Sequence, residues 1–357
     1  MSFFPTPFEQ IARARTDLRL GLAVVLRHGI GGTLVAAADG LRSQALSDVR
    51  ALGAPQLAIT AQRAQTLRAR VYDGDLARLN VPADADVSWI SAVIDPKDDL
   101  NHPMKGPFRE VRDGDASLAR AALGLMKSAR LLPAAVLVPV NEVPSGVLSL
   151  NLDATLEGLN APIEQHPIVS GRVPLSVADA GRVHLFRPVD GGDEHVVCEI
   201  GRPPRDKPAL VRLHSACFTG DVLGSVKCDC GPQLHAAMAR MGETGAGILL
   251  YLSQEGRGIG LANKLRAYAL QDQGFDTVEA NHRLGFEDDE RDFRVGADLL
   301  KKLGFSSIRL MTNNPAKVEM MEAQGIKVVE RVPLKVGRGP QNTDYLDTKA
   351  TKSGHLL

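Results

Sequence analysis

The chain has 357 residues, and its 42 Lys and Arg balance 42 Asp and Glu, which gives a formal net charge of zero at pH 7. This balance excludes a polybasic nucleic-acid binder and an acidic tail protein. With 44% hydrophobic and 24% charged residues, the composition is that of a globular protein, and the length predicts two domains rather than a disordered or collagen-like chain.

Membrane insertion and secretion are not expected. The longest apolar stretches, residues 132–140 and 247–252, are shorter than the ~20 residues that cross a bilayer. Glu9, Arg13 and Arg15 interrupt the N-terminal segment before the apolar core of a signal peptide can form. We therefore expect a cytoplasmic protein with neither a membrane nor a nucleic acid as partner.

The first part of the chain alternates short apolar runs with helical periodicity. The elements expected there are strands at 22–26, 32–38 and 134–140 and helices at 41–52 and 116–130. They predict a small mixed α/β domain over residues 1–145.

Prolines and glycines make residues 141–174 loop-like, and we place a linker at 146–171. The second domain, residues 172–357, is expected to begin with a mainly antiparallel sheet and to continue with alternating helices and strands. The elements expected there are strands at 181–186, 195–200, 209–214, 247–252 and 308–312, and helices at 232–242, 260–274, 296–303 and from 315. The fold class is thus α+β, a mixed α/β protein of two domains.

The four cysteines are unevenly distributed, because three lie within fourteen residues and the first 197 residues contain none. Cys217, Cys228 and Cys230 have the spacing of a metal site, since two thiolates one residue apart can point at one centre. Three ligands would leave zinc one position for water. The spacing leaves two alternatives open: a closed structural zinc completed by His214 or His235, and buried thiols without metal. Cys198 lies in a strand pattern and is expected in the core.

Three further motifs concentrate polar residues in this half. The turn at 253–260 carries three glycines and Arg257 between a strand and a helix, which suits an anion or a simple tight turn. Residues 287–293 hold five carboxylates and one Arg, which indicates a site or a solvated helix start. Residues 312–317 place Thr and Asn before a helix that carries Lys317, a pattern that suits phosphate or a base edge.

Taken together, HSACFTGDVLGSVKCDCGPQL, YLSQEGRGIGLANKLRAYALQDQGFDTVEANHRLGFEDDERDF, LMTNNPAKVEMMEAQGIKVVERVPL and the terminal YLDTKATKSGHLL resemble GTP cyclohydrolase II over about residues 172–357. The resemblance implies a homodimer that converts GTP to 2,5-diamino-6-ribosylamino-4(3H)-pyrimidinone 5′-phosphate, formate and pyrophosphate, the first step of riboflavin synthesis. It also implies one Zn²⁺ per subunit for ring opening and Mg²⁺ with the triphosphate.

The resemblance assigns roles to individual residues. It implies Cys217, Cys228 and Cys230 as zinc ligands, Tyr268 as an aid to ring hydrolysis, and Asp289 as proton acceptor. It implies Arg291 as nucleophile toward the α-phosphorus, although a guanidinium with a pKa above about 12 suits charge stabilisation equally well. The GTP-binding positions it implies are Arg212, His214, Ser215, Gln233, Glu255, Gly256, Arg257, Thr277, Thr312 and Lys317.

Two positions depart from the family pattern. Ala216 stands where the family has Glu, and Leu252-Ser253 stand where it has His-Arg. A carboxylate and a cationic pair are thus lost, so a paralogue with a partial or altered reaction and a non-catalytic GTP-binding scaffold remain alternatives.

The N-terminal domain faintly resembles 3,4-dihydroxy-2-butanone-4-phosphate synthase, mainly in GLAVVLRHGIGGTLVAAAD. That enzyme needs an acidic Mg²⁺ loop where this chain has residues 27–32, which include no carboxylate. We therefore expect a degenerate domain without synthase activity that aids dimerisation or regulation. His102 and the charges at 95–99 are a less favoured candidate for an unrelated site.

Overall fold

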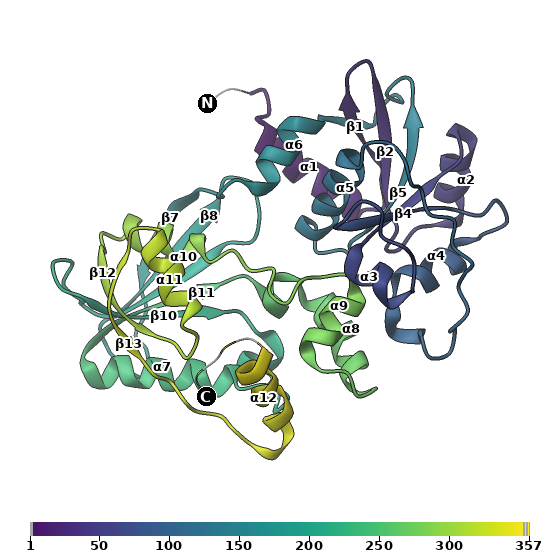
Figure 1. Cartoon of the computed structure of the whole chain (residues 1–357). Helices are drawn as coiled ribbons and strands as arrows, with labels where there is room; N and C mark the ends of the chain where they lie inside the picture. Colours follow the sequence, from purple (N-terminus) through teal and green to yellow (C-terminus); the bar gives the residue numbers. More distant parts are fainter. Residues whose placement is uncertain (1–2, 353, 355, 357) are drawn as a thin grey trace. The chain divides into compact units, whose positions relative to one another are not determined.

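The computed structural model describes residues 3–352, 354 and 356 (Figure 1). The chain forms two compact units. Unit 1 contains the residues up to Ala161 together with Ala262–Asp289, and unit 2 contains Pro162–Leu261 and the residues from Glu290 onward. The chain thus changes unit near the predicted linker, and it also returns to unit 1 for 28 residues, which the sequence did not predict.

Unit 1 is built on a six-stranded sheet in the order β4-β3-β5-β2-β1-β6. Only β1 and β6 pair in parallel; the other neighbours are antiparallel. The strands are β1 (Val24–His28), β2 (Gly31–Ala37), β3 (Gln56–Thr60), β4 (Leu76–Asn80), β5 (Ala134–Val140) and β6 (Leu148–Asn151). The helices are α1 (Pro7–Arg19), α2 (Ser43–Leu52), α3 (Ala61–Thr66), α4 (Val87–Ile94), α5 (Ser117–Ser128), α6 (Leu152–Asn160), α8 (Leu261–Gln271) and α9 (Thr277–Leu284).

The core of unit 1 forms where α1, α5 and α6 cover the sheet. Thr6 and Glu9 form a capping box at the start of α1, and Pro7 occupies its first turn. Ile11, Ala14 and Leu18 follow at helical spacing and are buried. The cap and the apolar stripe together explain this helix, which the sequence analysis did not predict.

Unit 2 is built on a seven-stranded sheet in the order β13-β12-β10-β11-β9-β8-β7. Its strands are β7 (Gln165–Arg172), β8 (Gly181–Pro188), β9 (His195–Gly201), β10 (Ala209–Ser215), β11 (Ala246–Leu252), β12 (Ser307–Met311) and β13 (Lys327–Val332). Its helices are α7 (Cys230–Thr244), α10 (Arg294–Lys302), α11 (Ala316–Ala323) and α12 (Thr343–Lys352).

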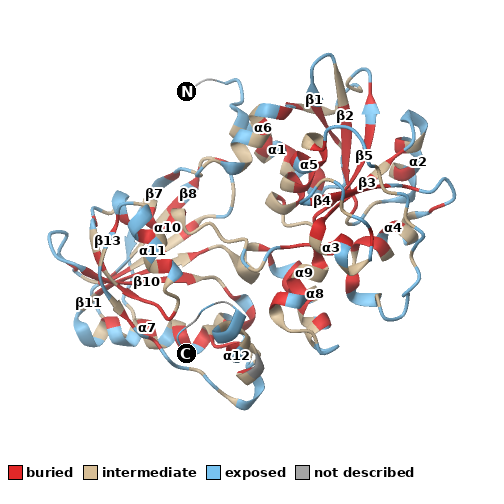
Figure 2. Ribbon diagram, in the orientation of Figure 1, coloured by how far each residue is buried: buried red, intermediate tan, exposed pale blue. Residues whose placement is uncertain are grey.

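The two faces of β11 show how the core of unit 2 is divided. Ile248, Leu250 and Leu252 join the cluster packed by α10 and α11, whereas Leu249 joins the cluster packed by α7. Figure 2 shows buried residues along the central strands of this sheet. A central strand buried on both faces needs apolar residues at successive positions, which is the pattern of residues 246–252.

Two expectations about this part of the chain are wrong. The sheet is mixed rather than mainly antiparallel, because the helices α7 and α11 allow β10–β11 and β12–β13 to pair in parallel. Residues 141–174 are not simply a loop, since they form β6, α6 and β7. β7 tolerates Pro167 because it is an edge strand with an irregular register at that point.

The mixed α/β class and the two-part organisation are confirmed. Most predicted strands and helices recur with ends shifted by a few residues, and β5 has the predicted limits. Within the described ranges, no helix is both long enough and apolar enough for a bilayer span.

Leu250 tests the core of unit 2. Its side chain is fully buried in the centre of the sheet, so Leu250→Ala should lower the free energy of unfolding by about 2–5 kcal/mol. Val329→Ala, on an exposed β13 side chain, should cost less than about 1 kcal/mol. Urea denaturation of the two variants compares them, and equal losses would contradict this account of the core.

Candidate functional site

The three clustered cysteines converge in unit 2. Cys217 follows β10, Cys228 lies in the next turn, and Cys230 opens α7. Their sulfur atoms lie within 4.8 Å of one another, and the Cys217 and Cys228 sulfurs are 3.7 Å apart. Two sulfurs held tetrahedrally at 2.3 Å from zinc lie about 3.8 Å apart, so the spacing fits a thiolate zinc site.

Gly220 provides the space in which the sulfurs meet. It lies in the π-helical turn Phe218–Val222, and a Cβ there would be 2.9 Å from the Cys228 sulfur and 3.0 Å from the Cys217 sulfur. No larger residue fits without displacing a thiol. The need for glycine here is one of close approach and not of backbone angle.

A fourth protein ligand is absent from this group within the described ranges, where the cluster contains the three cysteines alone. The His214 imidazole bonds Asp221 instead, and His235 is exposed on α7. The donor set therefore suits a metal with an open coordination position rather than the closed site that the spacing also allowed.

The thiols favour their neutral form without a metal. A hydrogen bond with Cys217 raises the pKa of Cys228 to about 11, and contact with Cys217 and Cys228 raises the pKa of Cys230. A divalent cation would reverse this preference, because thiolate is the ligand form of cysteine.

Asp221 organises the approach to Cys217. Its carboxylate accepts hydrogen bonds from the His214 Nε2 at 3.0 Å, from the Tyr251 hydroxyl at 2.9 Å and from the Cys217 backbone N–H at 3.0 Å. Only 3% of this side chain is exposed, so these three donors replace the hydrogen bonds that water would otherwise make to the carboxylate. Burial and, to a smaller extent, the Asp221 charge raise the pKa of the Tyr251 hydroxyl, which therefore stays protonated and donates its hydrogen bond.

His214 is left with one uncommitted nitrogen. Burial lowers the pKa of its imidazole, although Asp221 opposes the effect. The neutral ring donates from Nε2 to Asp221, and the buried Nδ1 has no hydrogen-bond partner among the residues that the structure describes. A buried acceptor without a donor is costly unless a ligand or water supplies one.

A second buried network supports the other two cysteines. Asp229, between them, accepts from Lys349 of α12 at 2.8 Å and from the Gln233 amide, and Gln233 in turn accepts from Arg212. Arg212 also donates to the Met311 carbonyl. The network thus joins the cysteine turn to β10, β12 and α12.

The glycine-rich turn after β11 folds back onto the Cys217 segment. Glu255 accepts a hydrogen bond from the Phe218 N–H at 2.6 Å. Gly256 and Arg257 both have left-handed backbone angles, which is unusual for arginine and is fixed by the bond from the Glu290 N–H to the Arg257 carbonyl. The predicted tight turn is therefore present and held from both sides.

Arg291 and Lys317 meet at one aromatic ring. Their charged groups lie 4.6 Å and 4.5 Å from the centre of the Phe293 ring. Arg291 also donates to the Ser215 hydroxyl at 3.2 Å. Thr312, buried after β12, donates its backbone N–H to Val332. The acidic run at 287–293 precedes α10 and does not form its first turn.

Most predicted site residues are thus linked through contacts within unit 2. The exceptions are Tyr268, Thr277 and Asp289, which belong to unit 1. The Tyr268 ring lies 5.6 Å from the Lys264 ammonium on α8, and Thr277 accepts a hydrogen bond from Gln271 at the start of α9. Asp289 is the last residue of the returning segment.

The two departures from the family pattern are neighbours. The Ala216 N–H donates to the Leu252 carbonyl at 2.8 Å, and the Leu252 side chain is fully buried in the core. Ser253, the residue after β11, donates its hydroxyl to the Glu194 carbonyl at 2.6 Å and its backbone N–H to the His195 Nδ1 at 3.0 Å. The two departures therefore adjoin one another where β10 and β11 end.

Sequence reasoning missed Gly220, Asp221, Tyr251, Asp229 and Lys349. Gly220 and Asp221 fall in the spacer between Cys217 and Cys228, where ligand spacing gives no reason to single them out. Asp229 lies between two cysteines, and that position was the one available signal.

Comparisons with known proteins match both the second half of the chain and nearly its whole length. A family model described as GTP cyclohydrolase II matches residues 167–333. A GTP cyclohydrolase-2 of Azospirillum brasilense is 40% identical over 97% of this chain and 94% of its own length. One of Cronobacter sakazakii is 59% identical over 48% of this chain and 87% of its own length. A solved two-domain 3,4-dihydroxy-2-butanone 4-phosphate synthase from A. baumannii is 16% identical, with a TM-score of 0.32, over 85% of this chain and 93% of its own.

Gly220→Ala tests the packing of the three sulfurs. The added Cβ should displace a thiol and weaken zinc binding by at least about tenfold, measured by competition with a chromogenic chelator. Gly171→Ala, where a Cβ meets nothing within 4 Å, is the matched control and should leave the affinity unchanged. Unaltered affinity in Gly220→Ala would contradict the proposed ligand geometry.

Asp221→Asn tests the carboxylate that supports Cys217. The amide nitrogen cannot accept, so at least one of the three donors loses its partner, and zinc affinity should fall about 10- to 100-fold. Asp206→Asn removes an exposed carboxylate in the same unit and serves as control. The same chelator competition measures both variants; equal affinities would show that Asp221 has no part in holding the metal.

Proposed function

The chain belongs to the GTP cyclohydrolase II family, and we propose that it hydrolyses GTP to 2,5-diamino-6-ribosylamino-4(3H)-pyrimidinone 5′-phosphate, formate and pyrophosphate with zinc in the cysteine triad. The full-length match to the Azospirillum relative supports the enzyme class. The observation that carries the zinc assignment is the convergence of three thiols around Gly220 with no fourth protein ligand among the described residues.

Cys217, Cys228 and Cys230 would hold the zinc ion. When bound there, zinc supplies a Lewis acid that makes water a nucleophile near neutral pH. The neighbouring Glu255 and Asp221 fix the Cys217–Phe218 backbone and so orient one side of the ligand set. Asp229 and its partners fix the other side.

Base recognition is proposed for the buried end of β10. The free Nδ1 of His214 is an acceptor and suits an N–H donor such as those of guanine. Asp221 holds the ring in this tautomer through Nε2. Arg212, on the same strand, is joined to Gln233 and Asp229, and we propose that these bonds hold this end of β10 in place.

Phosphate recognition is proposed for Arg291 and Lys317, with Arg257, Gly256, Ser215 and Thr312. Two cations at one aromatic ring provide a fixed positive region, and a guanidinium binds phosphate oxygens in a bidentate manner. We assign Arg291 to charge stabilisation at the α-phosphate, because a protonated guanidinium has no free lone pair with which to attack as a nucleophile. Mg²⁺ enters with the triphosphate as part of the substrate.

The roles of the remaining predicted residues follow the family resemblance. We propose that Tyr268 assists ring hydrolysis by hydrogen bonding, that Asp289 accepts a proton, and that Thr277 contacts GTP. We also propose that the enzyme works in the cytoplasm as a homodimer.

A second candidate is a paralogue that binds GTP but turns it over partially or not at all. The observation in its favour is that Ala216 and Leu252, which are joined by a backbone hydrogen bond, stand at positions where the family pattern has charged residues. The zinc ligands and Arg291 are retained, which favours the complete reaction.

The deciding experiment is an anaerobic assay with GTP, Zn²⁺ and Mg²⁺ that quantifies formate, pyrophosphate and the pyrimidine. We expect equal amounts of formate and pyrophosphate, with loss of formate release in Cys228→Ser, which removes a zinc ligand. Cys198→Ser, on β9 outside the triad, should keep its activity. Intact GTP with saturable binding would support the non-catalytic alternative, and unequal products would support the partial one.

A further inference from the structure

Residues 262–289 lie within the stretch that the GTP cyclohydrolase II family model matches, yet they fold with unit 1. They carry α8 and α9 and include Tyr268 and Thr277. Their contacts with the N-terminal residues of unit 1 occur at the start, the middle and the end of the segment. This attachment therefore sets the position of α8 and α9 within unit 1.

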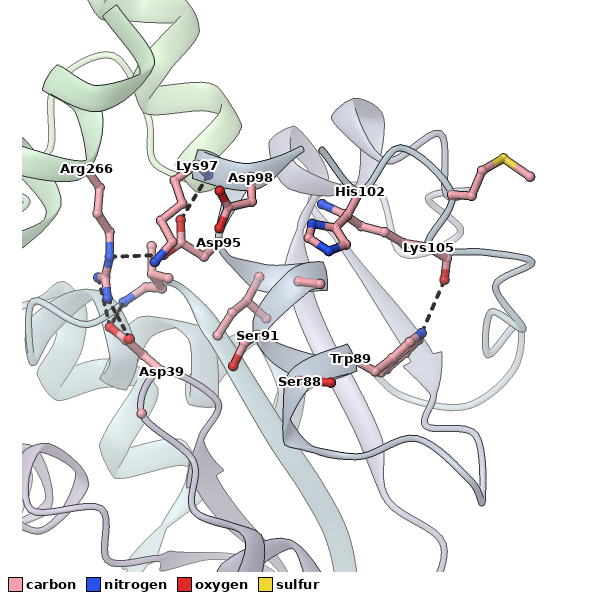
Figure 3. A pocket seen from close by; sticks show the side chains of 15 residues that line it. Asp39, Ser88, Trp89, Ser91, Asp95, Lys97, Asp98, His102, Lys105 and Arg266 are labelled. Atoms are coloured by element: carbon pink, nitrogen blue, oxygen red, sulfur yellow. Dashed lines mark hydrogen bonds and ion pairs between the residues drawn. The ribbon is translucent and has the colours of Figure 1, made fainter. Parts of the chain in front are cut away.

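The start of the segment is fixed by one arginine. Arg266 of α8 makes two parallel hydrogen bonds to the Asp39 carboxylate at 2.8 and 3.0 Å, and its Nε lies 3.5 Å from Asp95 (Figure 3). Asn263 extends the attachment, because it donates to the Arg130 carbonyl and accepts from Arg266. A bidentate, partly buried pair of this kind fixes orientation as well as distance.

The end of the segment is fixed by close packing. Gly285 ends α9 with a left-handed angle, and its carbonyl accepts from the Thr60 hydroxyl at 2.9 Å. A Cβ on Gly285 would lie 2.8 Å from that hydroxyl and 2.9 Å from Pro133. Two residues later, Glu287 accepts from the Gln62 amide at 2.6 Å.

The middle of the segment is tied to residues 95–99. The Gln273 amide donates to the Lys97 carbonyl at 2.9 Å, and Arg283 lies 3.9 Å from Asp99. Asp99 is itself held by the buried Arg63 through two hydrogen bonds. The acidic run that suggested a separate site in the sequence is thus engaged in attaching α8 and α9.

A cavity lies beside the Asp39–Arg266 pair in unit 1, and three carboxylates near it are already paired with cations of the protein. The cavity measures about 670 Å³ and is bordered by His102, Lys105, Asp95 and Arg266 (Figure 3). Asp39 and Asp95 face Arg266, and Lys105 pairs with Asp99. These carboxylates therefore already have cationic partners within unit 1.

We propose that Asp39 is a positioning residue that fixes α8 within unit 1 through Arg266. This inference rests on the proposed function, since it concerns the helices that carry Tyr268 and Thr277. A misplacement of about 1 Å at a reacting group reduces rates up to about 100-fold, so a loosened α8 should act on turnover without touching the metal.

The test is Asp39→Asn in the full-length protein. The amide keeps the shape of the side chain and an acceptor for the Leu132 N–H, but it loses the charge that Arg266 binds. We expect kcat/KM for GTP to fall about tenfold with zinc content unchanged, and hydrogen exchange to accelerate in residues 262–275. Asp39→Glu, which restores the charge, should recover part of the activity.

Asp75→Asn is the matched control. Asp75 forms an equally bidentate pair with Arg120 in unit 1, and neither residue contacts α8 or α9 through that pair. This variant should retain wild-type turnover and exchange in the segment. An equal loss in both variants would reduce the effect to general destabilisation of unit 1 and overturn the proposal.

GTP turnover and hydrogen exchange test the proposed function and the role of Asp39 separately. A wild-type protein that leaves GTP intact contradicts the proposed function, and exchange in Asp39→Asn still decides whether Asp39 holds the segment. Faster exchange with unchanged kcat/KM would overturn the positioning role. Unchanged exchange would overturn the attachment itself.

Discussion

The convergence of three thiols in a space that admits no side chain at Gly220 is the constraint on which unit 2 depends. It requires Cys217 at the end of a strand, Cys228 and Cys230 at the start of a helix, and a turn between them that passes within contact distance of the sulfurs. A parallel strand pair with a helical crossover satisfies this requirement, because β10 ends where α7 begins its return to β11. The order of the strands in the sheet and the positions of the three thiols are therefore set by the same β10–α7–β11 crossover.

Two buried carboxylates hold this arrangement from opposite sides. Asp221 receives three donors next to Cys217, and Asp229 receives Lys349 and Gln233 between the other cysteines. Each carboxylate is almost fully removed from water, so its stability depends on those donors being in place. The same bonds that satisfy the carboxylates thus fix the backbone that presents the thiols, and they also hold His214 with one nitrogen free.

Sequence patterns predicted what depends on local spacing. The three cysteines, the limits of β5 and the buried strand β11 all follow from periodicity or ligand spacing within a few residues. Residues 141–174 were misread because Pro167 and Gly171 stand in an edge strand, where the usual penalty for these residues is small. Asp221 and the attachment of residues 262–289 depend on partners far away in the sequence, such as Tyr251 and Asp39, and no local pattern encodes those distances.

Residues on the surface of unit 1 differ in how much the rest of the unit depends on them. The β1–β2 connection is a two-residue turn in which His28 pairs with Gly31, and its Ile30 is fully exposed, so changes there disturb no packing. Asp39, Thr60 and Arg63, in contrast, contact the returning segment or the residues that hold it. Substitutions in the β1–β2 turn should therefore cost the unit little stability, whereas loss of the Asp39 carboxylate would remove the charge that Arg266 of α8 binds.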